Sequence, residues 1–143
     1  METGMLHLHS VLRWIILVLL LVTLFGAFAK KQSIRSSSLW LLISAHIMFV
    51  IGIYQLIAGR YGIWKGLPAG VELMKDTTYR FYWVEHPLMM IIAIALITVA
   101  RRKAKALNYK ATGWLLLIAL ILILAAVPWP FREIVGRPWF PGM

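Results

Sequence analysis

Four apolar runs dominate this chain of 143 residues, at about residues 6–29, 39–58, 81–100 and 113–127. A helix rises about 1.5 Å per residue, so about 20 apolar residues cross a hydrocarbon core of about 30 Å. A segment in lipid must also satisfy its own backbone hydrogen bonds, and a helix does so. The sequence therefore predicts an all-α fold. We expect a transmembrane four-helix up-down bundle that forms a single membrane domain over residues 1–143.

The composition excludes a water-soluble globular domain. Hydrophobic residues make up 62% of the chain and charged residues only 14%, whereas soluble domains average about 45–50% and about 25%. The formal charge of +10 would suggest nucleic acid in a soluble protein. Every basic stretch here adjoins an apolar run, so we expect basic loops at a lipid surface and no nucleic-acid partner.

The chain contains no cysteine. This excludes disulfides, thiolate metal sites, iron–sulfur clusters and covalently attached haem. Any metal or cofactor must therefore be held by histidine, methionine, carboxylate or backbone groups.

The distribution of charge indicates an orientation. Eight basic residues lie in two short, acid-free connections at residues 30–35 and 101–110, and all five acids fall toward the opposite side. By the positive-inside rule we expect these connections in the cytoplasm and both termini outside. Lys30 and Lys31 follow the first apolar run instead of preceding it, which favours a retained helix over a cleaved signal peptide.

Two segments outside the runs have their own character. The expected external loop, residues 60–80, contains Gly62, Gly66 and Pro68 and shows no sustained period, which predicts irregular structure. The expected tail, residues 128–143, contains prolines that exclude a further helix. Its aromatic residues favour an interfacial anchor at headgroup depth.

Polar side chains within the runs are the candidate functional residues. An ionisable group at mid-bilayer costs at least about 2.5–3.5 kcal/mol, so it usually faces the bundle interior or a cavity. The first three runs contain such residues and the fourth has none comparable. They are His7, His9 and Arg13 in the first run, Ser44, His46, Tyr54 and Gln55 in the second, and Glu85 and His86 in the third.

Helical spacing limits which of these side chains can meet. Successive residues are about 100° apart, so His7 and His9 point apart, and His46 and Gln55 fall on opposite faces. At most one of the latter two can join an outer polar cluster. In an up-down bundle the first and third spans are parallel and diagonal. His9 and His86 then project from opposite walls into the outer half of the core.

This arrangement predicts a haem b site. Imidazoles from two helices can bind both axial positions of the iron, and an arginine can neutralise a propionate. We expect His9 and His86 as the ligands. Arg13, four residues from His9 on the same face, is expected near a propionate or paired with Glu85. His46 lies near the midplane and is the substitute for either ligand, or the ligand of a second site.

Two other interpretations stay open. In a structural or accessory membrane subunit, Arg13 and Glu85 form an intramembrane ion pair, and each histidine bonds a backbone carbonyl or Tyr54. In a small proton-coupled carrier, Glu85 beside His86 binds and releases a proton. Pro87 should weaken the third span locally in either case.

Several short motifs are distinctive as a set. They are residues 9–14 (HSVLRW), 45–46 (AH), 74–76 (MKD), 80–81 (RF), 84–90 (VEHPLMM) and 128–132 (PWPFR). Together they resemble, over nearly the whole chain, a family of small bacterial four-helix membrane proteins labelled cytochrome b. The positions that match the family's polar residues are His9, Arg13, His46, Glu85 and His86.

The resemblance implies a multi-pass protein of the bacterial inner (plasma) membrane that binds haem and transfers electrons. Pro87 stands where relatives have an aliphatic residue, which affects the local backbone and not the ligand. We expect an electron carrier or membrane subunit more than a stand-alone enzyme. The expected partners are the lipid bilayer, quinone and a respiratory or redox partner. Such a membrane protein could also form an oligomer.

Overall fold

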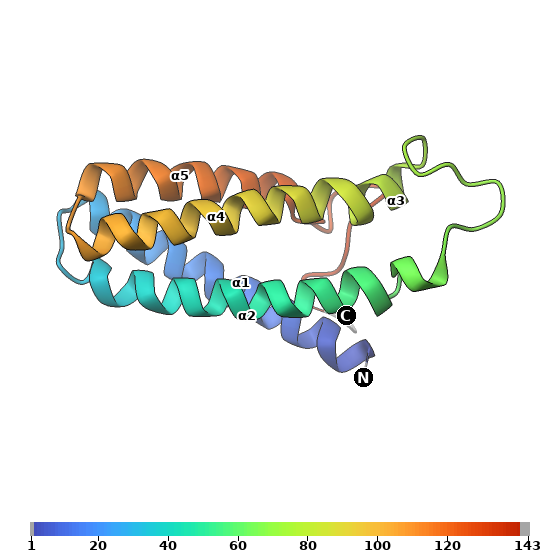
Figure 1. Ribbon diagram of the computed structural model, residues 1–143, viewed down its shortest axis with the longest axis horizontal. Coiled ribbons are helices and arrows are strands. Elements are labelled where there is room, and N and C mark those ends of the chain that lie inside the picture. The colour runs from blue at the N-terminus through green and yellow to red at the C-terminus, as the bar shows by residue number, and fades with distance from the viewer. Residues whose placement is uncertain (1, 141–143) are drawn as a thin grey trace.

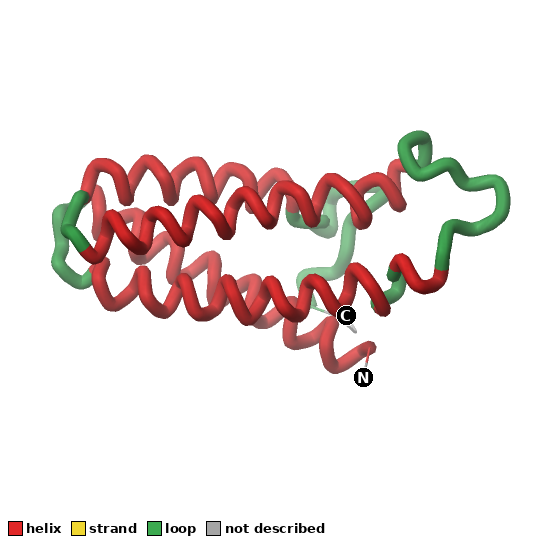
Figure 2. The backbone as a smooth tube through the Cα atoms, viewed as in Figure 1, coloured by secondary structure: helices red, strands yellow, loops and turns green. Residues whose placement is uncertain are grey.

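Four long helices run the length of the molecule in the computed structural model, which describes residues 2–140 (Figure 1). They are α1 (Glu2–Phe28), α2 (Ile34–Ala58), α4 (His86–Lys105) and α5 (Tyr109–Ala126). The four helical segments they form or belong to are long and apolar enough to cross a membrane. No strand occurs among the described residues (Figure 2). The predicted all-helical class is confirmed, and each of the four predicted apolar runs falls in one of these helical segments.

The helices form an up-down bundle in which α1 and α4 are diagonally opposite. Both α1 and α4 pack mainly against α2 and α5, so α1 and α4 lie across the bundle from each other. Two short turns, residues 29–33 and 106–108, lie together at one end, which we call the short-turn end (Figure 1). The connection after α2 and both ends of the described chain lie at the other, the long-loop end.

The core contains both leucine and alanine side chains. Leu20, Leu41 and Leu116 are almost fully buried, and so are Ala93 and Ala119. Small residues let helix backbones approach closely, and this contact replaces the hydrophobic drive that lipid does not supply. The outward faces are also apolar, as expected for helices that contact lipid.

The third span consists of three helical types in sequence. It begins with α3 (Thr77–Arg80), continues through the π-helical turn η2 (Phe81–Glu85) and ends with α4. The His86 N–H bonds to the carbonyl of Phe81, five residues back. Pro87 has no N–H to donate to the carbonyl four residues before it, so regular α-helical bonding is incomplete at this point. The local weakness expected from Pro87 therefore coincides with a π turn.

The segments outside the bundle differ in how closely they pack. The connection between α2 and α3 is irregular apart from the 3-10 turn η1 (Ile63–Lys65). The tail folds back on the long-loop end, where Val135 is buried and Arg132 donates hydrogen bonds to the carbonyls of Ala125 and Val127. Through residue 140 the tail is thus part of the fold. Residues 141–143 of the expected tail lie outside the described residues.

Candidate functional site

His9 of α1 and His86 at the start of α4 lie side by side toward the long-loop end. Their ring centroids are 6.3 Å apart and their planes are inclined by 47°. Both side chains are half-buried, whereas His7, two residues before His9, is exposed. The structure therefore brings together the two histidines that helical spacing and the diagonal arrangement had paired.

The His86 ring is held in one orientation by a backbone acceptor. Its Nδ1 atom lies 2.7 Å from the carbonyl oxygen of Ala126 at the end of α5. A carbonyl only accepts, so Nδ1 carries the proton and donates it, and in the neutral ring Nε2 is then the unprotonated nitrogen. Metal-binding histidines are oriented by hydrogen bonds of this kind. The His9 ring makes no hydrogen bond with any residue between 2 and 140, so its nitrogens are free of protein partners in that range.

Arg13 lies one helical turn from His9 and is surrounded by aromatic rings. Its Nη2 donates to the carbonyl of Trp139 at 2.6 Å, and its guanidinium carbon is 5.2 Å from the Trp14 ring centre and 5.9 Å from that of Trp129. The Nε of Arg13 and the Nε1 of Trp14 are buried without a hydrogen-bond partner in the described part of the chain. Two adjacent residues thus present buried donors that an acidic or carbonyl oxygen could satisfy.

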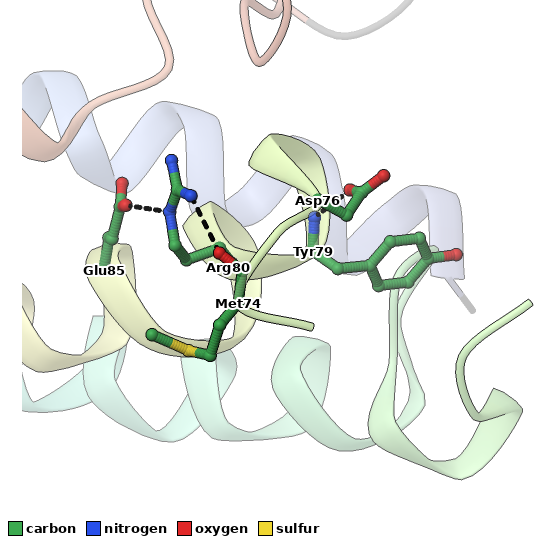
Figure 3. A network of polar contacts seen from close by, with 5 residues as sticks. All are labelled: Met74, Asp76, Tyr79, Arg80 and Glu85. Atoms are coloured by element: carbon green, nitrogen blue, oxygen red, sulfur yellow. Dashed lines mark hydrogen bonds and ion pairs between the residues drawn. The ribbon is translucent and has the colours of Figure 1, made fainter. Parts of the chain in front are cut away.

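The expected ion pair between Arg13 and Glu85 is wrong. Glu85 Oε1 instead accepts a 2.8 Å hydrogen bond from Arg80 Nε, and Arg80 Nη1 donates to the carbonyl of Met74 (Figure 3). In a regular α-helix, residues five apart point about 140° away from each other. The π turn between them brings such residues onto one side. The carrier hypothesis relied on an intramembrane Glu85, and this carboxylate is already paired at the long-loop end.

The polar residues of α2 do not join the histidine pair. His46 is exposed on the outer surface of the bundle, and its Nδ1 bonds to the carbonyl of Leu42 in the same helix. Its expected role as a substitute for His9 or His86 does not fit this arrangement. Gln55 points the other way and donates to the carbonyl of Met5 in α1 at 3.2 Å. The two residues therefore lie on opposite faces of α2, as predicted.

The bonding partners expected for the histidines are partly correct. His46 and His86 each bond a backbone carbonyl, as the structural hypothesis proposed. Tyr54 is half-buried and makes no side-chain hydrogen bond with residues 2–140, so it is not a partner of any histidine there.

Sequence reasoning missed a set of contacts between the tail and the start of the third span at the long-loop end. The Tyr82 hydroxyl donates to the carbonyl of Val135 at 2.7 Å and accepts from Arg137 Nε at 2.9 Å. Tyr61 stacks on Tyr82 with ring centres 4.8 Å apart. The sequence signal for these contacts was the presence of Arg132 and Arg137 among the aromatic residues of the tail. The same pattern is typical of residues at lipid headgroups, so it did not predict contacts within the chain.

The described residues offer no larger metal cluster around the pair. No group of three or more His, Cys, Asp or Glu in residues 2–140 is arranged to hold a metal ion. Two shallow hollows lie on the surface of α1 and α2, and neither is lined by His9 or His86.

Comparisons with protein-family models, with curated proteins and with solved structures found no match for the chain.

Proposed function

We propose that the chain is a b-type haem protein that transfers electrons in the membrane, and that His9 and His86 would hold the haem iron. The observation that carries this proposal is the spacing of the two rings. A metal–imidazole bond is about 2 Å long and the ring centre lies about 1 Å beyond the nitrogen, so rings on opposite sides of one metal ion have centres about 6 Å apart. The rings of His9 and His86 are 6.3 Å apart.

The residues around the pair fit the needs of the group. His86 presents Nε2 because Nδ1 is bonded to Ala126. Arg13 is a cation with an unpaired buried N–H one turn from His9, and it would hold a propionate. When bound, haem supplies one-electron chemistry whose potential depends on axial ligands and on the polarity of the surroundings.

The setting of this activity is part of the proposal. We place the protein in the bacterial inner membrane with the short-turn end in the cytoplasm and the histidine pair toward the outside. The support is the charge distribution, in which the short-turn end has eight basic residues and no acid. Quinol is the proposed electron donor because it is dissolved in the same membrane.

The proposal is tested by the reduced-minus-oxidised visible spectrum of protein purified in mild detergent from its native membrane. A pyridine haemochrome assay gives the stoichiometry. A sharp alpha band with about one haem per chain is expected from one site with two histidine ligands. A folded, helical sample without haem would reject it.

One set of contacts favours a second candidate, a structural or accessory membrane subunit. The Arg13, Glu85 and His86 side chains each make a hydrogen bond within the chain, to Trp139, Arg80 and Ala126. Such contacts can fix helix register without any ligand. This candidate predicts a stable bundle that shows no Soret band under any growth condition.

A further inference from the structure

The short-turn end of the bundle carries positive charge without any counter-charge. Eight basic residues lie there: Lys30, Lys31, Arg35, Arg101, Arg102, Lys103, Lys105 and Lys110. All except the half-buried Arg101 are exposed. The three ion pairs within residues 2–140 involve Glu2, Glu72 and Glu85, and all belong to the opposite end. The charge at the short-turn end therefore has to be neutralised by anions from outside the chain.

Two of these cations, Arg35 of α2 and Arg101 of α4, each donate a hydrogen bond to the backbone of the other's helix. Arg35 Nε at the start of α2 donates to the carbonyl of Lys105 at the end of α4, at 3.1 Å. Arg101 Nη1 in α4 donates to the carbonyl of Arg35 at 3.1 Å. Because carbonyls accept these bonds, both guanidiniums keep their full charge and further N–H donors. The arrangement holds two arginines on one corner of the bundle, ready for an oxyanion.

The depth of this end in the membrane is marked by aromatic residues. Trp40 of α2 and Trp114 of α5 lie toward it and are 57% and 54% exposed. Tryptophan side chains facing outward near helix ends gather at the headgroup level of a bilayer. The basic side chains follow within a few residues, so their charged groups lie among lipid headgroups while their aliphatic stems extend along the helices.

We propose that the short-turn end binds the headgroups of anionic phospholipids, with Arg35 and Arg101 holding a phosphate. A lipid fits better than an acidic protein because the two turns, residues 29–33 and 106–108, are short and the exposed Trp40 and Trp114 beside them are typical of headgroup depth. The unpaired positive charge selects anionic lipids over zwitterionic ones.

The test compares spin-labelled phosphatidylglycerol with spin-labelled phosphatidylcholine in bilayers that contain the reconstituted protein. The fraction of label immobilised on the protein gives the relative association constant. The wild type should prefer phosphatidylglycerol, and salt should weaken this preference. The double variant Lys30→Gln, Lys31→Gln should lower the preference about twofold to fivefold. These exposed lysines make no side-chain hydrogen bond with residues 2–140, so the fold should be unaffected.

A matched control removes the same charge from the other end. Lys65→Gln, Lys75→Gln should leave the preference unchanged, because Lys65 and Lys75 already pair with Glu2 and Glu72. Equal loss in both double variants, or no preference in the wild type, would overturn the proposal. The second outcome would direct attention to an acidic protein at this face. The fraction of immobilised lipid does not depend on haem, so this test can succeed or fail independently of the spectral test for haem.

Discussion

The imidazole rings of His9 and His86 lie with their centres 6.3 Å apart, although α1 and α4 are not neighbours around the bundle. Side chains from two diagonally opposite helices can meet only if both point into the bundle and lie at the same height along it. On α1 this position is shared with Arg13, one turn away, and on α4 it follows directly after the π turn. The pair is therefore a product of the whole bundle and not of one local motif.

The first prediction concerns these two residues. His9→Ala and His86→Ala should each abolish the Soret and alpha bands of a haem with two histidine ligands, while the helical circular dichroism stays unchanged. His7→Ala and His46→Ala are matched controls, because both histidines are exposed and should leave the spectrum as it is. Pyridine haemochrome stoichiometry on all four variants gives the measurement. Full haem content with an unshifted alpha band after either core substitution would contradict the assignment of ligands.

Much of this arrangement could be predicted from periodicity. The apolar runs gave all four spans, with α1 and α2 starting about one turn earlier than the runs because polar residues continue the helices. The 100° step of a helix separated His7 from His9 and His46 from Gln55 correctly. Up-down topology then placed His9 and His86 across the diagonal. These inferences depend only on geometry that every α-helix shares.

What could not be predicted depends on departures from that geometry. The π turn at Phe81–Glu85 changes the direction of later side chains, so Glu85 meets Arg80 and not Arg13. Pro87 predicted that regular α-helical hydrogen bonding would be interrupted in the third span. It did not predict that a π turn would take the place of the regular pattern. The tail has no period at all, and the contact of Arg13 with Trp139 depends on where a proline-rich segment turns. Long-range contacts of irregular segments leave no signature in spacing.

The second prediction tests which partner Glu85 has. In a double-mutant cycle, Arg80→Ala with Glu85→Ala should show a coupling free energy of a few tenths to about 1 kcal/mol. The value is small because the two side chains are 33% and 38% exposed and solvent screens the pair. The cycle of Arg13→Ala with Glu85→Ala should give coupling near zero. Thermal unfolding in detergent supplies the free energies of unfolding. A larger coupling free energy for Arg13 with Glu85 than for Arg80 with Glu85 would support the intramembrane ion pair of Arg13 and Glu85.

The third prediction concerns a hydroxyl contact between α1 and α2. Thr23 is fully buried, and its Oγ1 lies 2.8 Å both from the carbonyl of Leu19 and from Ser37 Oγ in α2. Thr23→Val keeps the shape and removes the contact, so it should destabilise the bundle by about 0.6–1.7 kcal/mol. Thr98→Val is the control, because within residues 2–140 the Thr98 side chain bonds only to Ile94 in its own helix. Equal effects of the two changes would show that the interhelical contact contributes nothing.

The fourth prediction concerns the close approach of α1 and α5. A Cβ atom at Gly113 would lie 3.0 Å from the Phe28 ring, whereas one at Gly52 in α2 would meet no atom within 4 Å. Changing either glycine to alanine gives the same gain in helix propensity, about 1 kcal/mol at most. The steric conflict is present only at Gly113, so Gly113→Ala should be less stable than Gly52→Ala, by up to about 1 kcal/mol because the half-exposed Phe28 ring can shift.

Removing the obstructing ring identifies the cause of that difference. In a Phe28→Ala background the two alanine variants should have equal unfolding midpoints, because the added methyl group then meets no ring. The comparison cancels the loss of the Phe28 side chain, including its edge-on contact with Trp114, since both variants share that loss. If the difference persists without Phe28, the cost at Gly113 arises from the α5 backbone, and the steric explanation is wrong.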